Sequence, residues 1–455
     1  MQTAFDAYFT ALQGKQILVM GLGVSNRPLV KRLLHYGCNV IGCDRTPREK
    51  LDEEVLALET AGCKLHVGED YLENLQADLV FRTPGMHPDI PALKKLRDSG
   101  AKVTSEMQVF FELCPCHLLA VTGSDGKTTT TTLISEILKA EGKTVWLGGN
   151  IGTPLLSSVP QMEPDHWAVV ELSSFQLMDM TLSPQVAVIT NLAPNHLDVH
   201  KDMEEYVWAK QNLYRYQNER DVLVLNADNA ITCDFAGKGE TRYFAREKKL
   251  KKGVYLYKNW IYRDETKVLD TDTIAIPGVH NIENYMAAIA ALQGIASDEA
   301  VRHVAANFGG VEHRIELVRV KDGVKFYNDS IASSPSRTIA GLNSFSQKVL
   351  LIAGGYDKHI PYDVLGPVIC DRVKTLFVNG ATGHLIRQAV EQAPNYQVGA
   401  PEIVDCRDFT DAVLRSAQAA ESGDVVLMSP ASAAFDQFKN FMERGEYYKK
   451  LIKEL

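Results

Sequence analysis

Several features that would place this 455-residue chain in a special class are missing from it. It has no apolar run of membrane-spanning length, so we expect no membrane partner. Its net charge of −9 lacks the excess of basic residues that a nucleic-acid-binding face needs, so we expect no nucleic-acid partner. Residues 1–15 contain no basic segment followed by an apolar one, which argues against a secretory signal.

Cysteines are few and scattered. Of the eight, only Cys114 and Cys116 lie close together, and no second pair completes a zinc site. Reduced thiols in the cytoplasm are therefore the better interpretation. The remaining composition, 45% hydrophobic and 23% charged, is typical of a soluble globular enzyme. We expect a cytoplasmic protein that acts as a monomer.

The most informative segment is residues 117–134, HLLAVTGSDGKTTTTTLI. An apolar strand-like run enters a turn of small residues, and Lys127 then opens a helix. Glycines let backbone N–H groups approach phosphate oxygens, the helix N-terminus favours negative charge, and a hydroxyl can hold Mg²⁺. The usual spacing has a glycine where this chain has Val121, so the loop is a variant. A glycine turn beside a surface lysine is the alternative, but the combination predicts a site for ATP or GTP.

Strand-like segments alternate with helical ones along the whole chain, which predicts an α/β fold with parallel sheets. Among the predicted strands are Gln16–Met20, Trp167–Glu171 and Val425–Met428. We predict three domains, with a Rossmann-like unit over residues 1–106 and a central P-loop ATPase-like sheet over residues 107–312. A second Rossmann-like unit follows over residues 313–455. Short polar strands around residues 240–275 indicate a small antiparallel insertion in the central domain.

The first strand is followed by Gly21-Leu22-Gly23, which resembles a dinucleotide fingerprint, with Asp44 about where a ribose-binding acid would fall. Asn26 replaces the third glycine of that pattern. The same geometry holds any pyrophosphate at a helix N-terminus, including that of a UDP-sugar. A nicotinamide site and a turn without a ligand are the alternatives for this segment.

Further polar residues follow strands of the central series. Glu171 ends a strand beside the predicted nucleotide loop, where a carboxylate can bind Mg²⁺ or merely cap the sheet edge. His196 and Asp198 lie on the loop after another strand, at the same predicted edge. Lys210 lies on an amphipathic helix and is either a solvated lysine or one that reacts with CO₂. The resulting carbamate would be an anion able to bind a second Mg²⁺.

Polar residues also cluster in the last third of the chain. They open a helix at residues 278–284 and flank the second predicted boundary at residues 313–314 and 328–330. Amide, guanidinium and carboxylate groups in such positions could hold a nucleobase, a phosphate and a ribose.

Taken together, these segments resemble the Mur ligase family over nearly the whole chain, and GNIG, ELSSFQL and DQFKNF are specific to it. The resemblance implies an N-terminal domain for a UDP substrate, a central domain for ATP and a C-terminal domain for an amino acid. Within the family, ELSSFQL and SPASAAFDQFKNF favour the reaction that adds D-glutamate to UDP-N-acetylmuramoyl-L-alanine in peptidoglycan synthesis. The resemblance implies an acyl-phosphate intermediate, ATP as co-substrate and two Mg²⁺ ions.

The resemblance also implies roles for particular residues. The residues expected to border the UDP substrate are Val24, Ser25, Asp44, Arg45, Thr83 and Asn150. Those expected to hold ATP are Gly123, Ser124, Asp125, Gly126, Lys127, Thr128, Thr129, Asn281, Arg314 and Asp329. Thr128 and Glu171 would serve the nucleotide Mg²⁺, and His196 and carbamylated Lys210 the second ion. The residues expected to be catalytic are Lys127, Glu171, His196 and Lys210, and those expected to bind D-glutamate are Ser333, Lys358 and Phe441.

Two positions depart from the family's pattern. Ile331 stands where the best-known sequences have lysine, and Ala434 stands where a serine contacting the D-glutamate carboxylate is expected. Either another side chain replaces these contacts, or the pocket is composed differently.

Other classes of protein share parts of the pattern. A folylpolyglutamate synthetase would match the central and C-terminal segments but not the N-terminal glycine turn. A nicotinamide oxidoreductase would leave TGSDGKT unexplained. A Mur ligase for another amino acid and a non-catalytic nucleotide-binding regulator are the remaining alternatives, and the regulator would be expected to lack Lys127, Glu171, His196 or Lys210.

Overall fold

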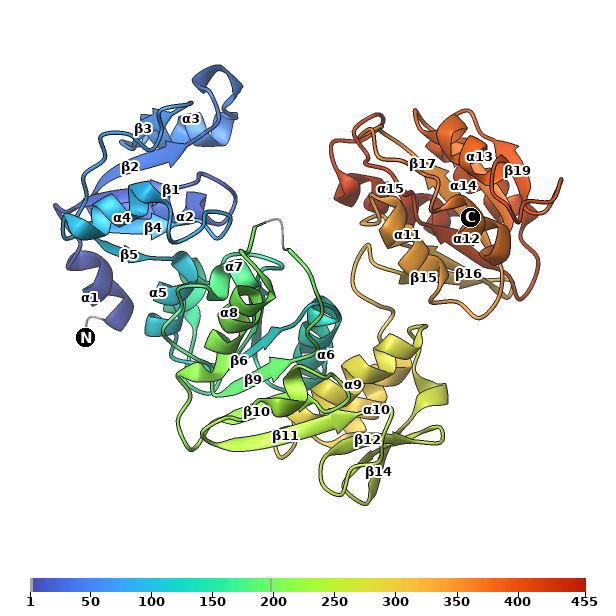
Figure 1. The fold of residues 1–455 in the computed structure, drawn as a ribbon, viewed down its shortest axis with the longest axis horizontal. Helices are drawn as coiled ribbons and strands as arrows, with labels where there is room; N and C mark the ends of the chain where they lie inside the picture. The colour runs from blue at the N-terminus through green and yellow to red at the C-terminus, as the bar shows by residue number, and fades with distance from the viewer. Residues whose placement is uncertain (1–2, 197–198) are drawn as a thin grey trace. The chain divides into compact units, whose positions relative to one another are not determined.

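The computed structural model describes residues 3–196 and 199–455. In this part of the chain the strands form three sheets, of five, nine and six strands (Figure 1). One compact unit holds the first two sheets and comprises the chain up to Asp270 together with Glu283–Val304, and a second unit comprises Thr271–Ile282 and Ala305–Leu455. The predicted α/β fold is confirmed, whereas the domain boundaries near residues 106 and 312 stay a prediction.

The first sheet is fully parallel, with strand order β3-β2-β1-β4-β5. Its strands are β1 (Gln16–Met20), β2 (Asn39–Asp44), β3 (Lys64–Val67), β4 (Leu79–Arg82) and β5 (Lys102–Thr104). The helices of this region are α1 (Ala4–Thr10), α2 (Asn26–His35), α3 (Glu53–Thr60) and α4 (Pro91–Asp98). The order reverses between β1 and β4, and ligands of open α/β sheets bind at such a point, outside the carboxyl ends of the strands.

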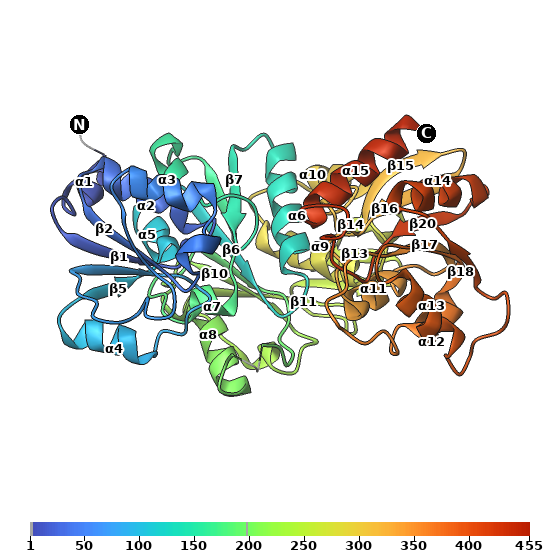
Figure 2. The ribbon, with the colours of Figure 1, turned by 90° about the horizontal axis from the view of Figure 1, so that it is seen from above.

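Strand β1 shows why these helices lie on two sides of the sheet. Ile17 and Val19 pack in one hydrophobic core, which also contains residues of α1 and α2. Leu18 and Met20 pack in another core, which contains residues of α4. Successive side chains of a strand point to opposite faces, so a continuous apolar run is buried on both. Figure 2 accordingly shows α4 on one side of the sheet and α1 and α2 on the other.

The second sheet has the order β14-β13-β12-β11-β10-β9-β6-β8-β7. Its parallel part consists of β6 (His117–Thr122), β7 (Val145–Gly149), β8 (Trp167–Glu171), β9 (Val186–Ile189), β10 (Val222–Asn226), β11 (Glu240–Ala245) and β12 (Val254–Tyr257). The helices before and between these strands are α5 (Glu106–Leu113), α6 (Lys127–Ala140), α7 (Ser174–Leu177) and α8 (Met203–Arg215). The register pairs Val121 with Glu171, so the carboxyl ends of β6 and β8 lie side by side.

The antiparallel insertion predicted around residues 240–275 is confirmed in part. Strands β13 (Trp260–Arg263) and β14 (Thr266–Asp270) pair antiparallel with each other, and β13 pairs antiparallel with β12. However, β11 pairs parallel with both of its neighbours, and all four strands extend the central sheet. Two helices follow, α9 (Val279–Ala291) and α10 (Asp298–Asn307).

The third sheet has the order β15-β16-β20-β17-β18-β19, and only the β15–β16 pair of the described sheet is antiparallel. Its strands are β15 (Glu316–Lys321), β16 (Val324–Asn328), β17 (Val349–Gly354), β18 (Val373–Asn379), β19 (Glu402–Asp405) and β20 (Val425–Met428). The helices on the face of one core are α11 (Pro335–Leu342), α12 (Gly366–Arg372) and α13 (Gly383–Glu391). Those on the opposite face are α14 (Phe409–Ala419) and α15 (Phe441–Glu454) (Figure 2).

None of the helices in the described part of the chain is both long and apolar enough to cross a membrane. The eight cysteines are all free thiols.

Candidate functional site

The loop between β6 and α6 has a backbone that two of its glycines make possible. Gly126 has a φ of +76°, and a Cβ atom there would lie 2.4 Å from Asn284 Oδ1. A Cβ atom on Gly123 would lie 1.9 Å from Thr190 Oγ1. Both distances are too short for a Cβ contact, so a side chain at either position would force the neighbouring side chain or the loop to shift. Asn284 belongs to the polar segment 278–284 that the sequence indicated for nucleotide contact, and it borders the predicted nucleotide loop.

The loop is held in shape by the segment that follows β9. Asn191 accepts the Ser124 N–H with its backbone oxygen at 2.9 Å and the Asp125 N–H with its Oδ1 at 2.9 Å. Thr190 Oγ1 donates to the Asp125 carbonyl at 2.5 Å. Among the described residues no side chain caps the N-terminus of α6, where Gly126 occupies the N-cap position. The first amides of this helix thus form the kind of site at which phosphate oxygens bind.

Lys127 begins α6 and folds back over the loop. Its Nζ donates to the carbonyl of Gly123 at 3.0 Å and to that of Ser124 at 2.9 Å. Carbonyl oxygens are weak partners for an ammonium group compared with phosphate oxygens. The lysine is therefore placed beside the predicted phosphate position. Thr129 follows it on α6 and is largely buried.

Thr128 and Glu171 meet where β6, α6 and β8 come together. Thr128 Oγ1 donates to Glu171 Oε2 at 2.7 Å, and Asn150 Nδ2 donates to Glu171 Oε1 at 2.7 Å. Glu171 is 1% exposed. A buried carboxylate beside a hydroxyl, with an amide holding its second oxygen, presents the hard oxygen ligands that Mg²⁺ prefers. Asn150 thus contacts this carboxylate, and its expected place at the UDP substrate stays a prediction.

Lys210 lies on α8 and is buried against the same loop. Its Nζ donates to Gly123 O at 2.8 Å and Thr122 Oγ1 at 3.1 Å, and it lies 5.0 Å from the centre of the Tyr206 ring. Burial lowers the pKa of Lys210 well below its ordinary value, and the charge of Lys127 acts in the same direction. Because Lys210 is buried, the interpretation as a solvated lysine is wrong. The sequence pattern did not reveal which face of α8 is buried.

His196 packs its ring against Phe175 on α7, with the ring centres 5.1 Å apart. Asp198, which we expected beside it, lies outside the described residues. The neighbouring His200, which the sequence analysis missed, is buried with its Nε2 2.9 Å from Ser174 Oγ and its Nδ1 3.5 Å from Glu205. Burial lowers the pKa of His200 although Glu205 opposes the shift.

A cavity of about 1210 Å³ lies at the carboxyl ends of the first sheet. Of the residues predicted to border the UDP substrate, Asp44, Arg45 and Thr83 line it. Val24 and Ser25 are not among its lining residues, and Val24 is exposed. Further side chains that line the cavity were not among the predicted residues: Tyr71, Met86, His87 and Lys95.

Asp44 shapes the floor of this cavity. Its Oδ2 accepts the Leu22 N–H at 2.8 Å and its Oδ1 accepts the Thr46 N–H at 2.9 Å. Although burial opposes the shift, these backbone donors hold the pKa of Asp44 below its ordinary value. The carboxylate thus fixes the glycine turn after β1.

In the second unit, Asp329 follows the carboxyl end of β16, beside the end of β20. Asp329 is fully buried, and burial raises its pKa to about 7 even though Ser429 Oγ donates to its Oδ2 at 2.7 Å. The charge of nearby Arg314 acts against that rise. Asn281, at the start of α9, donates to the Pro277 carbonyl at 2.5 Å.

The residues predicted to bind D-glutamate lie on loops of the second unit. Lys358 is exposed in the loop after β17, and Ser333 lies in the loop before α11. Phe441 begins α15, and its carbonyl accepts the Ser330 hydroxyl at 2.7 Å. The buried Arg444, which the sequence did not single out, donates to Ser330 and to two carbonyls of the loop after β20. The two loops are therefore held together by one guanidinium.

The two departures from the family pattern have different surroundings. Ile331 has a guanidinium beside it, because Arg337 Nη1 on α11 donates to its carbonyl at 3.3 Å. Arg337 is exposed. Ala434 is 2% exposed, and its carbonyl accepts N–H groups of Gln437 and Phe438. A positive charge thus lies near Ile331. Ala434 is buried and its methyl side chain offers no polar group to a ligand.

Two regions of the chain match models of known protein domains. Residues 121–292 match the Mur ligase middle domain, and residues 313–432 match the Mur ligase glutamate ligase domain. Two curated relatives, from Acetivibrio thermocellus and Ruminiclostridium cellulolyticum, are 50% and 48% identical over the full length of both chains. A third, from Clostridium botulinum, is 46% identical over the full length. All three are named UDP-N-acetylmuramoylalanine–D-glutamate ligase.

Solved structures show the same fold at lower identity. UDP-N-acetylmuramate–alanine ligase from Thermotoga maritima has a TM-score of 0.58 at 18% identity, covering 97% of this chain and 99% of that one. A UDP-N-acetylmuramoyl-L-alanyl-D-glutamate–2,6-diaminopimelate ligase has a TM-score of 0.57 at 17% identity, covering 98% and 93%. The chain belongs to the Mur ligase family.

Proposed function

We propose that this protein is an ATP-dependent ligase that joins D-glutamate to UDP-N-acetylmuramoyl-L-alanine in peptidoglycan precursor synthesis. The observation that carries the proposal is the identity of 46–50% over the full length with relatives named for that reaction. A match over the whole length includes the loops after β16, β17 and β20, where an amino-acid pocket would lie, as well as the nucleotide loop.

ATP is proposed to bind at the loop between β6 and α6. The first amides of α6 and the ammonium group of Lys127 supply donors for the β- and γ-phosphates. Asn281, Arg314 and Asp329 are proposed to contact the remainder of the nucleotide.

Two Mg²⁺ ions are proposed to act with these residues. The hydroxyl of Thr128 and the carboxylate of Glu171, 2.7 Å apart, fit the first ion by the chemistry of their oxygens. His196 and a carbamate on Lys210 would hold the second. When bound, the ions neutralise charge on the phosphates and on the attacking carboxylate.

The carbamate is proposed because Lys210 has the properties its formation needs. Burial lowers the pKa of this lysine, so its neutral amine is more accessible than that of an exposed lysine. The amine nitrogen attacks the carbon of CO₂, an N–C bond forms, and a proton leaves. A buried cation is thereby converted into an anion that can ligate a metal.

The UDP substrate is proposed to occupy the cavity of the first sheet. The glycine turn and the N-terminus of α2 suit a pyrophosphate, and Arg45 and Lys95 add positive charge to the lining. The terminal carboxylate of the UDP substrate would then reach toward Glu171 and the nucleotide loop.

The proposed reaction has two steps. An oxygen of the terminal carboxylate attacks the γ-phosphorus of ATP, an O–P bond forms, and the bond to the β-phosphate oxygen breaks to release ADP. The amine of D-glutamate then attacks the acyl carbon, a C–N bond forms, phosphate leaves and the nitrogen loses a proton. Lys127 would offset the repulsion between the anionic nucleophile and the phosphates, which is the principal barrier.

D-Glutamate is proposed to bind in the second unit near Ser333, Lys358 and Phe441. It carries two carboxylates and needs fixed positive charge. Lys358 would supply one cation, and the guanidinium of Arg337 would replace the charge that Ile331 lacks.

The test measures ADP release by the purified protein with ATP, Mg²⁺ and UDP-N-acetylmuramoyl-L-alanine. D-Glutamate, L-glutamate, L-alanine, L-lysine and meso-diaminopimelate are supplied as competing acceptors. We expect release only with D-glutamate, and Lys127→Ala should abolish it. Preference for a diamino acid would assign the enzyme another place in the family, and release without any amino acid would contradict the ligase proposal.

We further propose that the protein works as a cytoplasmic monomer. The free state of all eight cysteines supports a reducing compartment.

A further inference from the structure

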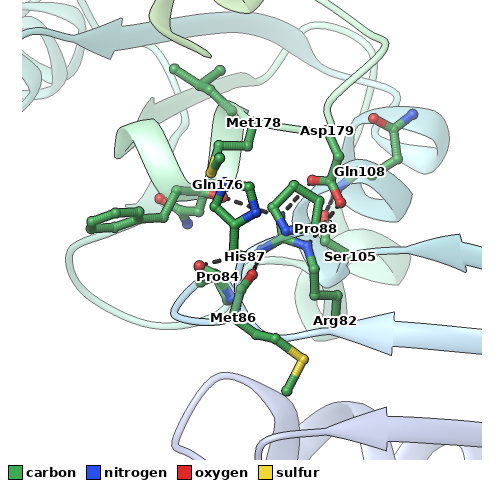
Figure 3. Close-up of polar contacts among 12 residues, drawn as sticks. Arg82, Pro84, Met86, His87, Pro88, Ser105, Gln108, Gln176, Met178 and Asp179 are labelled. Carbon is green, nitrogen blue, oxygen red and sulfur yellow. Dashed lines mark hydrogen bonds and ion pairs between the residues drawn. The ribbon is translucent and has the colours of Figure 1, made fainter. Parts of the chain in front are cut away.

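The guanidinium of Arg82 is shared between two segments far apart in the sequence (Figure 3). Arg82 ends β4 of the first sheet, and its side chain is 0% exposed. It meets the segment Phe175–Asp179, which belongs to the second sheet's region and begins four residues after Glu171. The residue belongs neither to the sets predicted from the sequence nor to the proposed chemistry.

One nitrogen of the guanidinium holds the loop that follows β4. Arg82 Nη1 donates to the carbonyls of Thr83 at 3.1 Å and Pro84 at 3.3 Å, and also to that of Met86. Thr83, Met86 and the next residue, His87, line the cavity of the first sheet. This part of the arginine therefore supports a wall of the cavity from behind.

The other two nitrogens hold the helix next to the nucleotide loop. Arg82 Nε and Nη2 form a bidentate pair with the two oxygens of Asp179 at 2.8 and 2.6 Å, and Nη2 also donates to the Phe175 carbonyl at 3.1 Å. Phe175 lies on α7, and its ring packs against His196. A guanidinium has its donors in a rigid plane, so it fixes direction as well as distance between the partners.

A second polar contact joins the same loop to another element of the nucleotide region. His87 Nε2 lies 3.5 Å from Glu205 Oε1. Glu205 lies in the first turn of α8, the helix that carries Lys210. The cavity wall is thus connected to α7 and α8, which hold His196 and Lys210 in place.

We propose that Arg82 is a positioning residue that sets the distance and direction between the UDP cavity and the phosphate-transfer site. This inference rests on the proposed function, in which a single substrate spans the two. A substrate held at one end presents its other end to the reacting group at a high effective concentration only if the two sites are rigidly related. A ligand that occupies the cavity alone does not depend on that relation.

Asp179 is the residue with which to test the proposal, because Arg82 contacts it on the side away from the cavity loop. Asp179→Asn keeps the shape of the side chain but removes the charge, and Asp179→Glu keeps the charge but alters its reach. Arg82→Lys keeps the positive charge, but a single ammonium group cannot donate to both segments in the planar geometry of the guanidinium. The matched control is Arg263→Lys, since Arg263 forms a bidentate pair with Asp298 between β13 and α10 of the same unit.

Two measurements are made on each full-length variant after its thermal transition is recorded. The first is kcat/KM for UDP-N-acetylmuramoyl-L-alanine with saturating ATP and D-glutamate. The second is the dissociation constant of UDP alone. For Asp179→Asn and Asp179→Glu we expect kcat/KM to fall tenfold or more while the dissociation constant of UDP changes less than twofold. Arg82→Lys should weaken both, and Arg263→Lys neither.

Three results would contradict the inference in different ways. Equal losses of UDP affinity and of kcat/KM in Asp179→Asn would show that the pair only supports the cavity wall. Values indistinguishable from the Arg263→Lys control in both Asp179 variants would show that the pair has no role in the reaction. If the unmodified protein itself released no ADP with D-glutamate, the proposed function would fail, and the positioning role that rests on it would fail with it.

Discussion

The hydroxyl of Thr128 donates a 2.7 Å hydrogen bond to the carboxylate of Glu171, 43 residues further along the chain. One residue belongs to the first turn of α6 and the other ends β8. The bond exists because β6 and β8 are neighbours whose carboxyl ends coincide.

Gly126→Ala should weaken nucleotide binding. An alanine there would have a strained φ of +76° and its Cβ would lie 2.4 Å from Asn284 Oδ1, so the Asn284 side chain or the loop must shift. We expect the dissociation constant of ADP to rise roughly tenfold or more, which corresponds to about 1.4 kcal/mol. Titration calorimetry checks this value.

The matched control for Gly126 is Gly142, just beyond the other end of α6. It has a φ of +78°, but a Cβ atom there would have nothing within 4 Å. Gly142→Ala should lower the free energy of unfolding by roughly 1–2 kcal/mol, the same cost of a left-handed backbone, without altering ADP affinity. Equal affinity in the two variants would contradict the role given to Gly126.

Lys210→Ala should lose nearly all ligase activity, because no carbamate can form. A small added carboxylate such as formate should restore part of the rate by occupying the vacated ligand position. Lys210→Arg should also be inactive, since a guanidinium cannot react with CO₂ and remains cationic. The measurement is ADP release with and without formate, and a fully active Lys210→Arg enzyme would refute the carbamate.

Lys358→Ala and Arg337→Ala should each raise KM for D-glutamate at least tenfold while changing KM for ATP little. Both would remove a positive charge from the pocket in which Ile331 offers none. Arg415→Ala, a change to an exposed arginine on α14, serves as the control. A normal KM for D-glutamate in Arg337→Ala would mean that this guanidinium does not replace the missing lysine.

Glu106 should make the stability of the first compact unit depend on pH. It is fully buried, accepts the Leu156 N–H at 3.1 Å, and burial raises its pKa to about 7 from 4.5. The folded state therefore binds the proton more tightly than the unfolded state. Its stabilising contribution is complete below pH 4.5 and is lost as pH rises to about 7, by roughly 3 kcal/mol in total.

Glu106→Gln keeps an acceptor for the Leu156 N–H but cannot titrate. The unfolding free energy of the original protein relative to this variant should therefore fall by roughly 3 kcal/mol as pH rises from 4.5 to about 7. Denaturant unfolding at several pH values measures it. A difference that is constant with pH would mean that Glu106 does not titrate in this range.

Much of the strand pattern could be predicted from the sequence. The strands Gln16–Met20, Trp167–Glu171 and Val425–Met428 have the predicted bounds. These are short apolar runs between turn residues, and such runs form buried strands whatever lies around them. The same local character made the nucleotide loop recognisable, because its glycines, lysine and hydroxyls are consecutive.

The contacts between strand ends could not be predicted in the same way. The sequence did not predict that the amide of Asn150 holds Glu171. Lys210 could not be recognised as buried, and His200 and Arg82 carried no local signal at all. Which loops meet at a sheet edge depends on the order of the strands, and that order is not contained in the spacing of residues along the chain.

The sequence alone therefore determined where the apolar strands lie, where the phosphate-binding turn begins and to which family the motifs point, because each depends on neighbours along the chain. Only the tertiary structure decided that Arg82 meets Asp179 across 97 residues and that one guanidinium serves two segments. The reason is that burying a charged group without partners costs free energy, so the guanidinium must pair with groups of whichever elements the fold places beside it.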